Sequence, residues 1–420
     1  MDNKNITNDN NTSLNDTQTK KKSIKKIVLS VILTLIFAIL AVGIYIGFIH
    51  KPDNGANSPP VFDTQGFDET IDGLYDLPEG EDPLTTDTSA NTEESTTEPV
   101  DPNTLPRSEQ DIYNFLFVGK DRVALNTDVI MLINFNTSTK KIAVLQIPRD
   151  TYIQLGYYNG KINGLFAYYY LTNKNDSKVA LRLLADTLEQ NLCIKIHNTA
   201  YIDLDGVTAI VDSLGGVEVN VPSTISYFDI DQRKYVTIPA GLQTLNGEQA
   251  EQFIRHRGTY LQADIGRGDA QKVFLSGLIK KVKSDFNLTT ISKLVENAFE
   301  YISTDVSLPD AVYFAKQLLG VDMSEIKFMS MLGCGAWSYP TGGGLSYYVM
   351  VRKNMREMID TYFNIYDFPI TDGIFDKNMV FTSKTIYPHF HKYYIRQDIV
   401  TEQPYNADNI NDNSISIPHV

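Results

Sequence analysis

Residues 112–147 read IYNFLFVGKDRVALNTDVIMLINFNTSTKKIAVLQI, and this stretch decides the fold. It contains three short apolar runs, at 112–119, 128–136 and 141–147. Each has the length and the aliphatic or aromatic content of a strand buried on both faces. The TSTK link between the second and third runs suits a tight turn. The stretch therefore predicts a buried sheet at the start of a globular domain.

Helical patterns alternate with strand patterns after this sheet. Apolar residues recur at helical spacing over 179–192, strand-like residues follow at 194–207, and 206–216 predicts a helix that Gly215 and Gly216 end. The segment LNGEQAEQFIRHR predicts a further helix, with Asn246 as N-cap and Gln249 at the capping-box position. Helices that alternate with strands indicate an α/β fold.

Later segments predict closing helices at 308–320 and 346–363, around a probable edge strand at 324–332. The aromatic run FAYYYL at 166–171, together with the helix at 179–192, could line an apolar tunnel. Aromatic residues at such spacing are more often plain core, so they are not counted as a site.

The N-terminal part predicts a membrane anchor. Residues 1–26 form a polar, disordered cytoplasmic arm that ends in a lysine cluster, and residues 27–49 are an uncharged apolar run of 23 residues. At 1.5 Å per residue this run covers the roughly 30 Å hydrocarbon core of a bilayer. Five lysines before it and one after it place the N-terminus in the cytoplasm and the rest of the chain outside.

Residues 50–107 predict an acidic, extended linker. Residues 52–106 contain 14 Asp and Glu and no Lys or Arg, which equals the net charge of −14 of the whole chain. The folded part is expected at 108–370, and 371–420 form an appendage without a predicted role. The two cysteines, Cys193 and Cys334, could pair or stay separate, and they have no zinc-site spacing.

Four groups of charged residues fall at expected strand ends or loops. They are Asp121 and Asp128 on either side of the first connection, Arg149 after Pro148, Lys161 in KING, and the cluster Arg255, Arg257 and Arg267. Asp264, Arg267, Gln271, Phe274 and Leu278 step by 3, 4, 3 and 4, which places them on one helical stripe. Taken alone, each group could be an ordinary turn residue or an ordinary surface charge. Together they indicate a diphosphate site with a divalent metal, because ligands bind at strand ends and forked arginines suit phosphate oxygens.

These residues resemble a known family. GKDR with TDVIML, IPRDTY, KINGLFAY, VDSLGGVEVNVP, GLQTLNGEQAEQFIRHR and the stripe from Asp264 to Gln271 occur in this order in the LytR-CpsA-Psr family of cell-wall polymer ligases. The resemblance covers about residues 111–360. It implies a three-layer α/β/α sandwich with a central mixed sheet, preceded by one transmembrane helix, and an activity that moves an anionic glycopolymer, such as teichoic acid or capsule, from undecaprenyl diphosphate to peptidoglycan.

The resemblance also implies roles for single residues. Asp121 and Asp128 match ligands of Mg²⁺ (or Mn²⁺), while Arg149, Lys161, Arg255, Arg257, Arg267 and Gln271 match positions that hold the diphosphate. Asp264 matches a supporting carboxylate, and either Asp121 or Asp264 could accept the proton of the sugar hydroxyl. The expected catalytic residues are thus Asp121, Asp128, Arg149 and Asp264. One departure is that the family often has arginine two residues before the second aspartate, where this chain has Asn126.

Two other functions fit the same residues. A membrane-anchored protein could bind a polyprenyl diphosphate without transferring it, or a hydrolase could use the same groups with water as nucleophile. Binding of nucleic acid is not expected, because the folded part lies outside the membrane and has no basic recognition helix.

Overall fold

The computed structural model describes residues 51–54, 105–120, 125–229, 233–256, 263–338, 345–350, 352–370 and 405–406. The expected arm at 1–26, the membrane segment at 27–49, most of the linker and nearly all of 371–420 lie outside these residues. Among the helices in the described ranges, none is both long and apolar enough to cross a bilayer.

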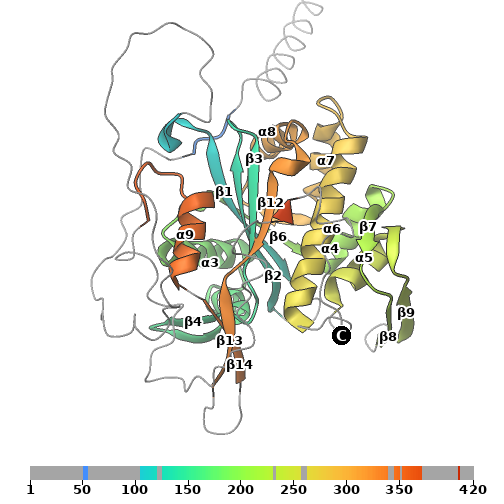
Figure 1. Cartoon of the computed structure of the whole chain (residues 1–420), viewed down its shortest axis with the longest axis horizontal. Helices are drawn as coiled ribbons and strands as arrows, with labels where there is room; N and C mark the ends of the chain where they lie inside the picture. The colour runs from blue at the N-terminus through green and yellow to red at the C-terminus, as the bar shows by residue number, and fades with distance from the viewer. Residues whose placement is uncertain are drawn as a thin grey trace, which may run out of the picture.

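A mixed, seven-stranded sheet forms the centre of the domain, in the order β11-β6-β1-β2-β3-β12-β15 (Figure 1). β1 pairs antiparallel with β2 and parallel with β6, and β3 pairs antiparallel with β2 and parallel with β12. The strands are β1 (Ile112–Lys120), β2 (Thr127–Asn136), β3 (Lys141–Gln146), β6 (Asn198–Asp203), β11 (Ile302–Thr304), β12 (Ile326–Ser330) and β15 (Tyr405–Asn406). The sheet expected from residues 112–147 is confirmed, and so is the central mixed sheet that the resemblance implies.

The two faces of this sheet pack against different helices, because alternate residues of a strand point to opposite faces. On what we call the α3 face, Leu116, Val118, Ile130 and Leu132 join a buried cluster with α2 (Leu165–Thr172), α3 (Ser177–Leu192) and α9 (Arg352–Tyr362). On the α6 face, Phe115, Phe117, Met131 and Ile133 join a second cluster with α4 (Leu204–Ser213), α5 (Gly247–Arg255), α6 (Ala263–Asp285) and α8 (Leu308–Leu319). α7 (Ile291–Ala298) packs on α8. Helices therefore cover both faces, as Figure 1 shows.

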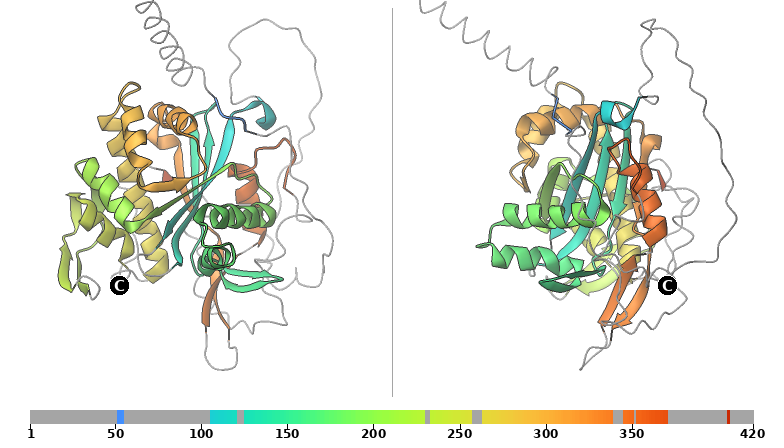
Figure 2. Two further views of the ribbon diagram at one scale, coloured as in Figure 1. Left: turned by 180° about the vertical axis from the view of Figure 1, so that it is seen from behind. Right: turned by 90° about the vertical axis from the view of Figure 1, so that its left-hand side faces the viewer.

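Small two-stranded pairs complete the domain. They are β4 (Tyr152–Leu155) with β5 (Tyr158–Lys161), β7 (Val217–Val221) with β10 (Gly241–Leu245), β8 (Ile225–Asp229) with β9 (Lys234–Ile238), and β13 (Gly333–Ser338) with β14 (Leu345–Met350). Both views of Figure 2 show the β13 and β14 pair extending beyond the end of the central sheet. Short 3-10 helices lie at Arg107–Glu109, Ile162–Gly164 and Met323–Glu325.

Side chains set the starts of α4 and α5. Asp203 accepts a hydrogen bond from the Gly206 amide at 2.8 Å and so caps α4. The Asn246 side chain accepts from the Gln249 amide at 2.9 Å, and the Gln249 side chain accepts from the Asn246 amide at 3.1 Å. This is the expected capping box, which satisfies two amides that the helix itself leaves without a partner.

Residues 51–54 lie against the start of β1. Lys51 Nζ is 2.5 Å from Asp111 Oδ1, and the Tyr113 hydroxyl donates to the Pro52 carbonyl at 2.7 Å. Asn54 Nδ2 donates to the Gln110 carbonyl at 2.7 Å, and Gln110 Nε2 donates to the Leu105 carbonyl at 2.5 Å. Asn54 and Leu105, the described residues on either side of 55–104, therefore both contact Gln110.

Two expected elements differ from the structure. Residues 346–350, expected as the first turns of a helix, belong to strand β14, because this strand pairs along its whole length with β13. β12 is not an edge strand, since it lies between β3 and the short β15. The run FAYYYL belongs to helix α2, whose Leu165, Phe166 and Tyr169 are buried in the α3-face core. The plain-core interpretation of that run is thus correct.

Candidate functional site: a charged mouth over an apolar cavity

The α6 face contains a cavity of about 220 Å³. Its walls come from β1, β2, β6 and β11 of the sheet and from α4 and α6, and they are mostly aliphatic and aromatic. Val207 of α4 and Phe274, Leu275 and Leu278 of α6 are among the lining residues. Lys120, Asp128, Arg255, Arg267 and Gln271 also line it, so polar groups gather at one part of an otherwise apolar wall. We call this polar part the mouth.

An irregularity in the sheet brings Asp128 to the mouth. Gly119 pairs with Val129, whereas Lys120 pairs with Thr127, so Asp128 is an extra residue on β2. Such a bulge redirects side chains. Without it, alternation would put Asp128 on the α3 face with Ile130 and Leu132. A Cβ atom on Gly119 would lie 3.0 Å from Val129 Cβ, which makes a residue without a side chain favourable at this crowded point.

Two arginines hold the Asp128 carboxylate. Arg149 donates from Nη1 to Asp128 Oδ1 at 2.8 Å, and Arg267 Nη1 lies 3.5 Å from Oδ2. Only 4% of the Arg267 side chain is exposed, compared with 21% for Arg149. A buried guanidinium is costly unless it is paired, so the ion pair with Asp128 offsets the burial of Arg267.

Lys161 reaches the mouth through a chain of charges. Arg149 Nε lies 3.8 Å from Asp150 Oδ1, and Lys161 Nζ lies 3.1 Å from the same oxygen. Lys161 also lies over the ring of Tyr347, 5.8 Å from its centre. Arg149 and Lys161 are not part of the cavity wall, so they lie on the outer side of Asp128.

Gln271 is fixed between α5 and β3. Its Nε2 donates to the Ile254 carbonyl at 3.1 Å, and its Oε1 accepts from Gln146 Nε2 at 2.7 Å. A Cβ atom on Gly268 would lie 2.7 Å from Gln146 Oε1, so a larger residue there would displace the end of the Gln146 side chain, which donates to Gln271. These bonds hold the part of α6 that carries Arg267.

Arg255 is held by a buried carboxylate on its own helix. Its Nη1 lies 3.1 Å from Oε1 of Glu251, whose side chain is 2% exposed. Tyr227 donates to Gln252 on the same helix, and its ring lies 5.2 Å from that of His256. Burial raises the pKa of the Tyr227 hydroxyl and lowers the pKa of the His256 imidazole, so both are neutral near pH 7.

The structure thus brings together most of the site residues that the sequence predicts. Asp128, Arg255, Arg267 and Gln271 line one mouth, with Phe274 and Leu278 of the predicted stripe on the same cavity, and Arg149 and Lys161 join the mouth through ion pairs. Asp121, Arg257 and the side chain of Asp264 lie outside the described residues. So does the side chain of Cys334, while Cys193 is buried at the end of α3.

Four residues of the site were not predicted. Asp150 and Glu251 bind the expected cations Lys161 and Arg255, and Lys120 and Asp203 line the cavity. Glu251 stands four residues before Arg255, which is a spacing that could have indicated the pair. Lys120 and Asp203 leave no comparable signal, because their position depends on strand register.

Asp128 is suited to be one ligand of the divalent ion that the resemblance implies. Its carboxylate is a hard oxygen donor at the point where diphosphate oxygens could complete the ligand set. Across the described ranges, no three His, Cys, Asp or Glu side chains gather as a metal site.

An apolar cavity with a cationic mouth is the arrangement expected of a lipid-diphosphate site, and comparison with known proteins gives the family. The model of the LytR_cpsA_psr family matches residues 82–364. The chain belongs to this family. Among relatives, it is 27% identical over 263 residues to TagV of Bacillus subtilis (strain 168), named a polyisoprenyl-teichoic acid–peptidoglycan teichoic acid transferase. It is 26% identical over 256 residues to TagU of Oceanobacillus iheyensis, which has the same descriptive name.

The matched region covers 59% of this chain and 65% of TagV, and 60% of this chain and 75% of TagU. Among solved structures, protein gbs0355 of Streptococcus agalactiae aligns with a TM-score of 0.50 at 20% identity, over 68% of this chain and 93% of that protein. This likeness concerns the fold alone. It agrees with the mixed sheet and flanking helices of this LytR_cpsA_psr protein.

Proposed function

We propose that this chain is a transferase that moves an anionic glycopolymer from a polyisoprenyl diphosphate carrier to peptidoglycan. Residues 27–49 would anchor it in the cell membrane of a Gram-positive-type bacterium, with the N-terminus in the cytoplasm and the catalytic domain outside. The observation that carries the proposal is the apolar cavity on the α6 face, with Asp128, Arg255 and Arg267 at its mouth. The names of TagV and TagU support the same class of donor and acceptor.

In this proposal the cavity takes the part of the isoprenoid tail next to the diphosphate. Burial of apolar surface stabilises the tail there, at about 25 cal/mol per Å². The diphosphate then lies at the mouth, where guanidinium groups of Arg255, Arg267 and Arg149 bind its oxygens. Arginine is suited to this because its planar fork can bind two phosphate oxygens at once.

The reaction is a displacement at phosphorus. A peptidoglycan hydroxyl, such as the 6-hydroxyl of muramic acid, attacks the sugar-linked phosphorus. The bond between that phosphorus and the oxygen that bridges the two phosphates then breaks. The electron pair of that bond stays on the lipid phosphate, and the hydroxyl proton passes to a base. The cations of the mouth stabilise the charge that builds up on the phosphoryl oxygens.

Asp128 is unsuited to be that base. Two arginines contact its oxygens, so its carboxylate is already engaged in ion pairs. Asp121 and Asp264 remain the proposed candidates, and Asp128 has the role of orienting Arg149 and Arg267. When bound beside Asp128, Mg²⁺ or Mn²⁺ supplies further charge neutralisation at the phosphates.

The test is transfer by the full chain in detergent micelles. A polyprenyl-diphosphate disaccharide is supplied with peptidoglycan oligomers and Mg²⁺, beside the variant Arg149→Ala and the exposed control variant Lys293→Gln. Glycosyl phosphate on peptidoglycan with wild type and Lys293→Gln, and its loss with Arg149→Ala, is the expected result. Release of polyprenyl phosphate without a modified acceptor would favour a hydrolase. Binding of the lipid without turnover would favour a lipid-diphosphate-binding protein.

A further inference from the structure

Lys120 is the last residue of β1, and it lines the cavity together with Gly119. Asp203, its neighbour in the parallel pairing of β1 with β6, lines the same cavity. The end of β1 therefore adds a lysine to the polar residues of the mouth.

Lys120 differs from the other cations at the mouth in its partners. Arg149 and Arg267 contact Asp128, Arg255 contacts Glu251, and Lys161 contacts Asp150. Lys120 has no ion pair or side-chain hydrogen bond within the described ranges. The acidic residue beside it in the sheet register, Asp203, accepts from the Gly206 amide as the cap of α4. An anion can thus reach the Lys120 ammonium without displacing a carboxylate.

The cations of the site also fall into two sets by position. Lys120, Arg255 and Arg267 belong to the cavity wall, whereas Arg149 and Lys161 lie outside it. If the cavity holds the lipid tail, the phosphate attached to the tail must lie next to the first set. The phosphate attached to the sugar then lies nearer Arg149 and Lys161.

We propose that Lys120 binds the lipid-side phosphate, both in the substrate diphosphate and in the polyprenyl monophosphate that leaves. This inference rests on the proposed function. When the acceptor oxygen bonds to the sugar-linked phosphorus, the bridging bond breaks and its electron pair adds negative charge to the lipid phosphate. Among the residues that the structure describes, Lys120 has no carboxylate partner, so its ammonium donors are available to stabilise this charge.

Equilibrium binding by the full chain in detergent micelles tests the proposal. Polyprenyl monophosphate and a polyprenyl-diphosphate disaccharide are each titrated into wild type, Lys120→Gln, Lys120→Arg and Lys161→Gln. Lys293→Gln on α7 is the matched control, because it removes one exposed lysine charge away from the cavity wall. Thermal unfolding of each variant checks that it is folded.

Lys120→Gln should weaken monophosphate binding about 10- to 100-fold, as expected for a hydrogen bond to a charged group. Lys120→Arg should restore most of it, and Lys293→Gln should match wild type. Lys161→Gln should weaken binding of the diphosphate more than binding of the monophosphate. Unchanged monophosphate binding by folded Lys120→Gln would overturn the inference while leaving the proposed function in place. If wild type binds neither lipid, the proposed function itself fails and the inference fails with it.

Discussion

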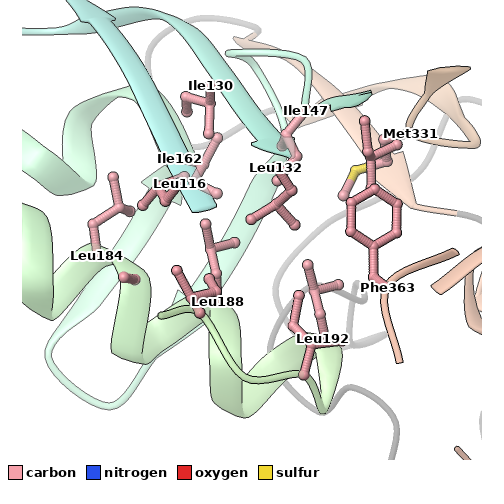
Figure 3. Close-up of a cluster of buried hydrophobic side chains, with 14 of the residues drawn as sticks. Leu116, Ile130, Leu132, Ile147, Ile162, Leu184, Leu188, Leu192, Met331 and Phe363 are labelled. Atoms are coloured by element: carbon pink, nitrogen blue, oxygen red, sulfur yellow. The ribbon is translucent and has the colours of Figure 1, made fainter. Parts of the chain in front are cut away.

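The two faces of the central sheet use alternate residues of the same strands, yet one face is filled and the other contains a cavity. On the α3 face, Leu184, Leu188 and Leu192 of α3 point toward the strands and are fully buried (Figure 3). On the α6 face, Phe274, Leu275 and Leu278 of α6 surround the cavity without filling it. The strands supply apolar side chains to both faces, so the difference comes from the helices.

α6 has a further property that α3 lacks. It turns polar residues, Arg267 and Gln271, to the same cavity that its apolar residues line. One helical stripe thus provides both a wall for a lipid tail and a charged end for its phosphates. We infer that the α3 face holds the domain together and that the α6 face carries the function.

The largest effect is expected from Asp128→Asn. The substitution keeps the size of the side chain and removes the charge that orients Arg149 and Arg267, so the transfer rate should fall about 100- to 1,000-fold. The control is Asp285→Asn at the far end of α6, where Asp285 pairs with Lys281 at 2.7 Å. A rate within about tenfold of wild type would show that the mouth does not depend on Asp128.

Leu188→Ala should destabilise the packed α3 face. Removal of this fully buried leucine leaves a void in the α3-face core and should lower the free energy of unfolding by about 2–5 kcal/mol in chemical denaturation. Leu275→Ala is the matched variant on the other face, where it enlarges an existing cavity and should cost about 1 kcal/mol. Equal losses in the two variants would contradict the difference between the faces.

Val207→Phe should partly fill the cavity on the α6 face. The larger ring would occupy part of the cavity that Val207 lines, so affinity for a polyprenyl phosphate should fall about tenfold. The free energy of unfolding should change by less than about 1.5 kcal/mol. Val179→Phe, at a 40% exposed position on α3, should alter neither quantity. Undiminished lipid affinity in Val207→Phe would place the tail elsewhere.

The smallest effect concerns the end of the sheet opposite the mouth. His197 accepts from the Asn114 amide at Nδ1 and donates from Nε2 to the Asn54 carbonyl, so its ring is neutral. Burial, as the main cause, and nearby Lys195 lower its pKa below 6.5, although Glu189 and the bonds to Asn54 and Asn114 raise it. The unfolded chain therefore binds more protons in acid, and stability is lost as the pH falls through 6.5.

For His197 this loss should reach about 1 kcal/mol between pH 7 and pH 5.5. His197→Gln should reduce the pH dependence of unfolding in this window, whereas the part due to His256, whose pKa burial also lowers, should remain. An identical pH profile in wild type and variant would show that the contact with residues 51–54 does not depend on the neutral ring.

Local patterns were enough to predict much of the fold. The apolar runs at 112–119, 128–136 and 141–147 became β1, β2 and β3, because continuous apolar runs of this length have few other stable forms in a buried sheet. The stripe through Arg267, Gln271, Phe274 and Leu278 was correct because helical spacing fixes a face. The capping box at Asn246 was correct for the same local reason.

Long-range register explains what could not be predicted. Strict alternation would put Asp128 on the filled face, and only the pairing of β1 with β2 reveals the bulge that moves it to the cavity. Strand β14 was interpreted as helix because its partner β13 is supplied by tertiary structure, which can override local preference. The choice between the two faces for the lipid tail likewise required the packing of α3 and α6.

Photo-crosslinking of the lipid tail tests the central claim most directly. A polyprenyl diphosphate with a diazirine in its first isoprene units is bound to the full chain in micelles and irradiated, and the labelled peptides are sequenced. The account predicts label on α4 and α6, at residues 204–213 and 263–285, and its loss when unlabelled lipid competes. Label on α2 and α3, at residues 165–172 and 177–192, would place the tail on the filled face and contradict the account.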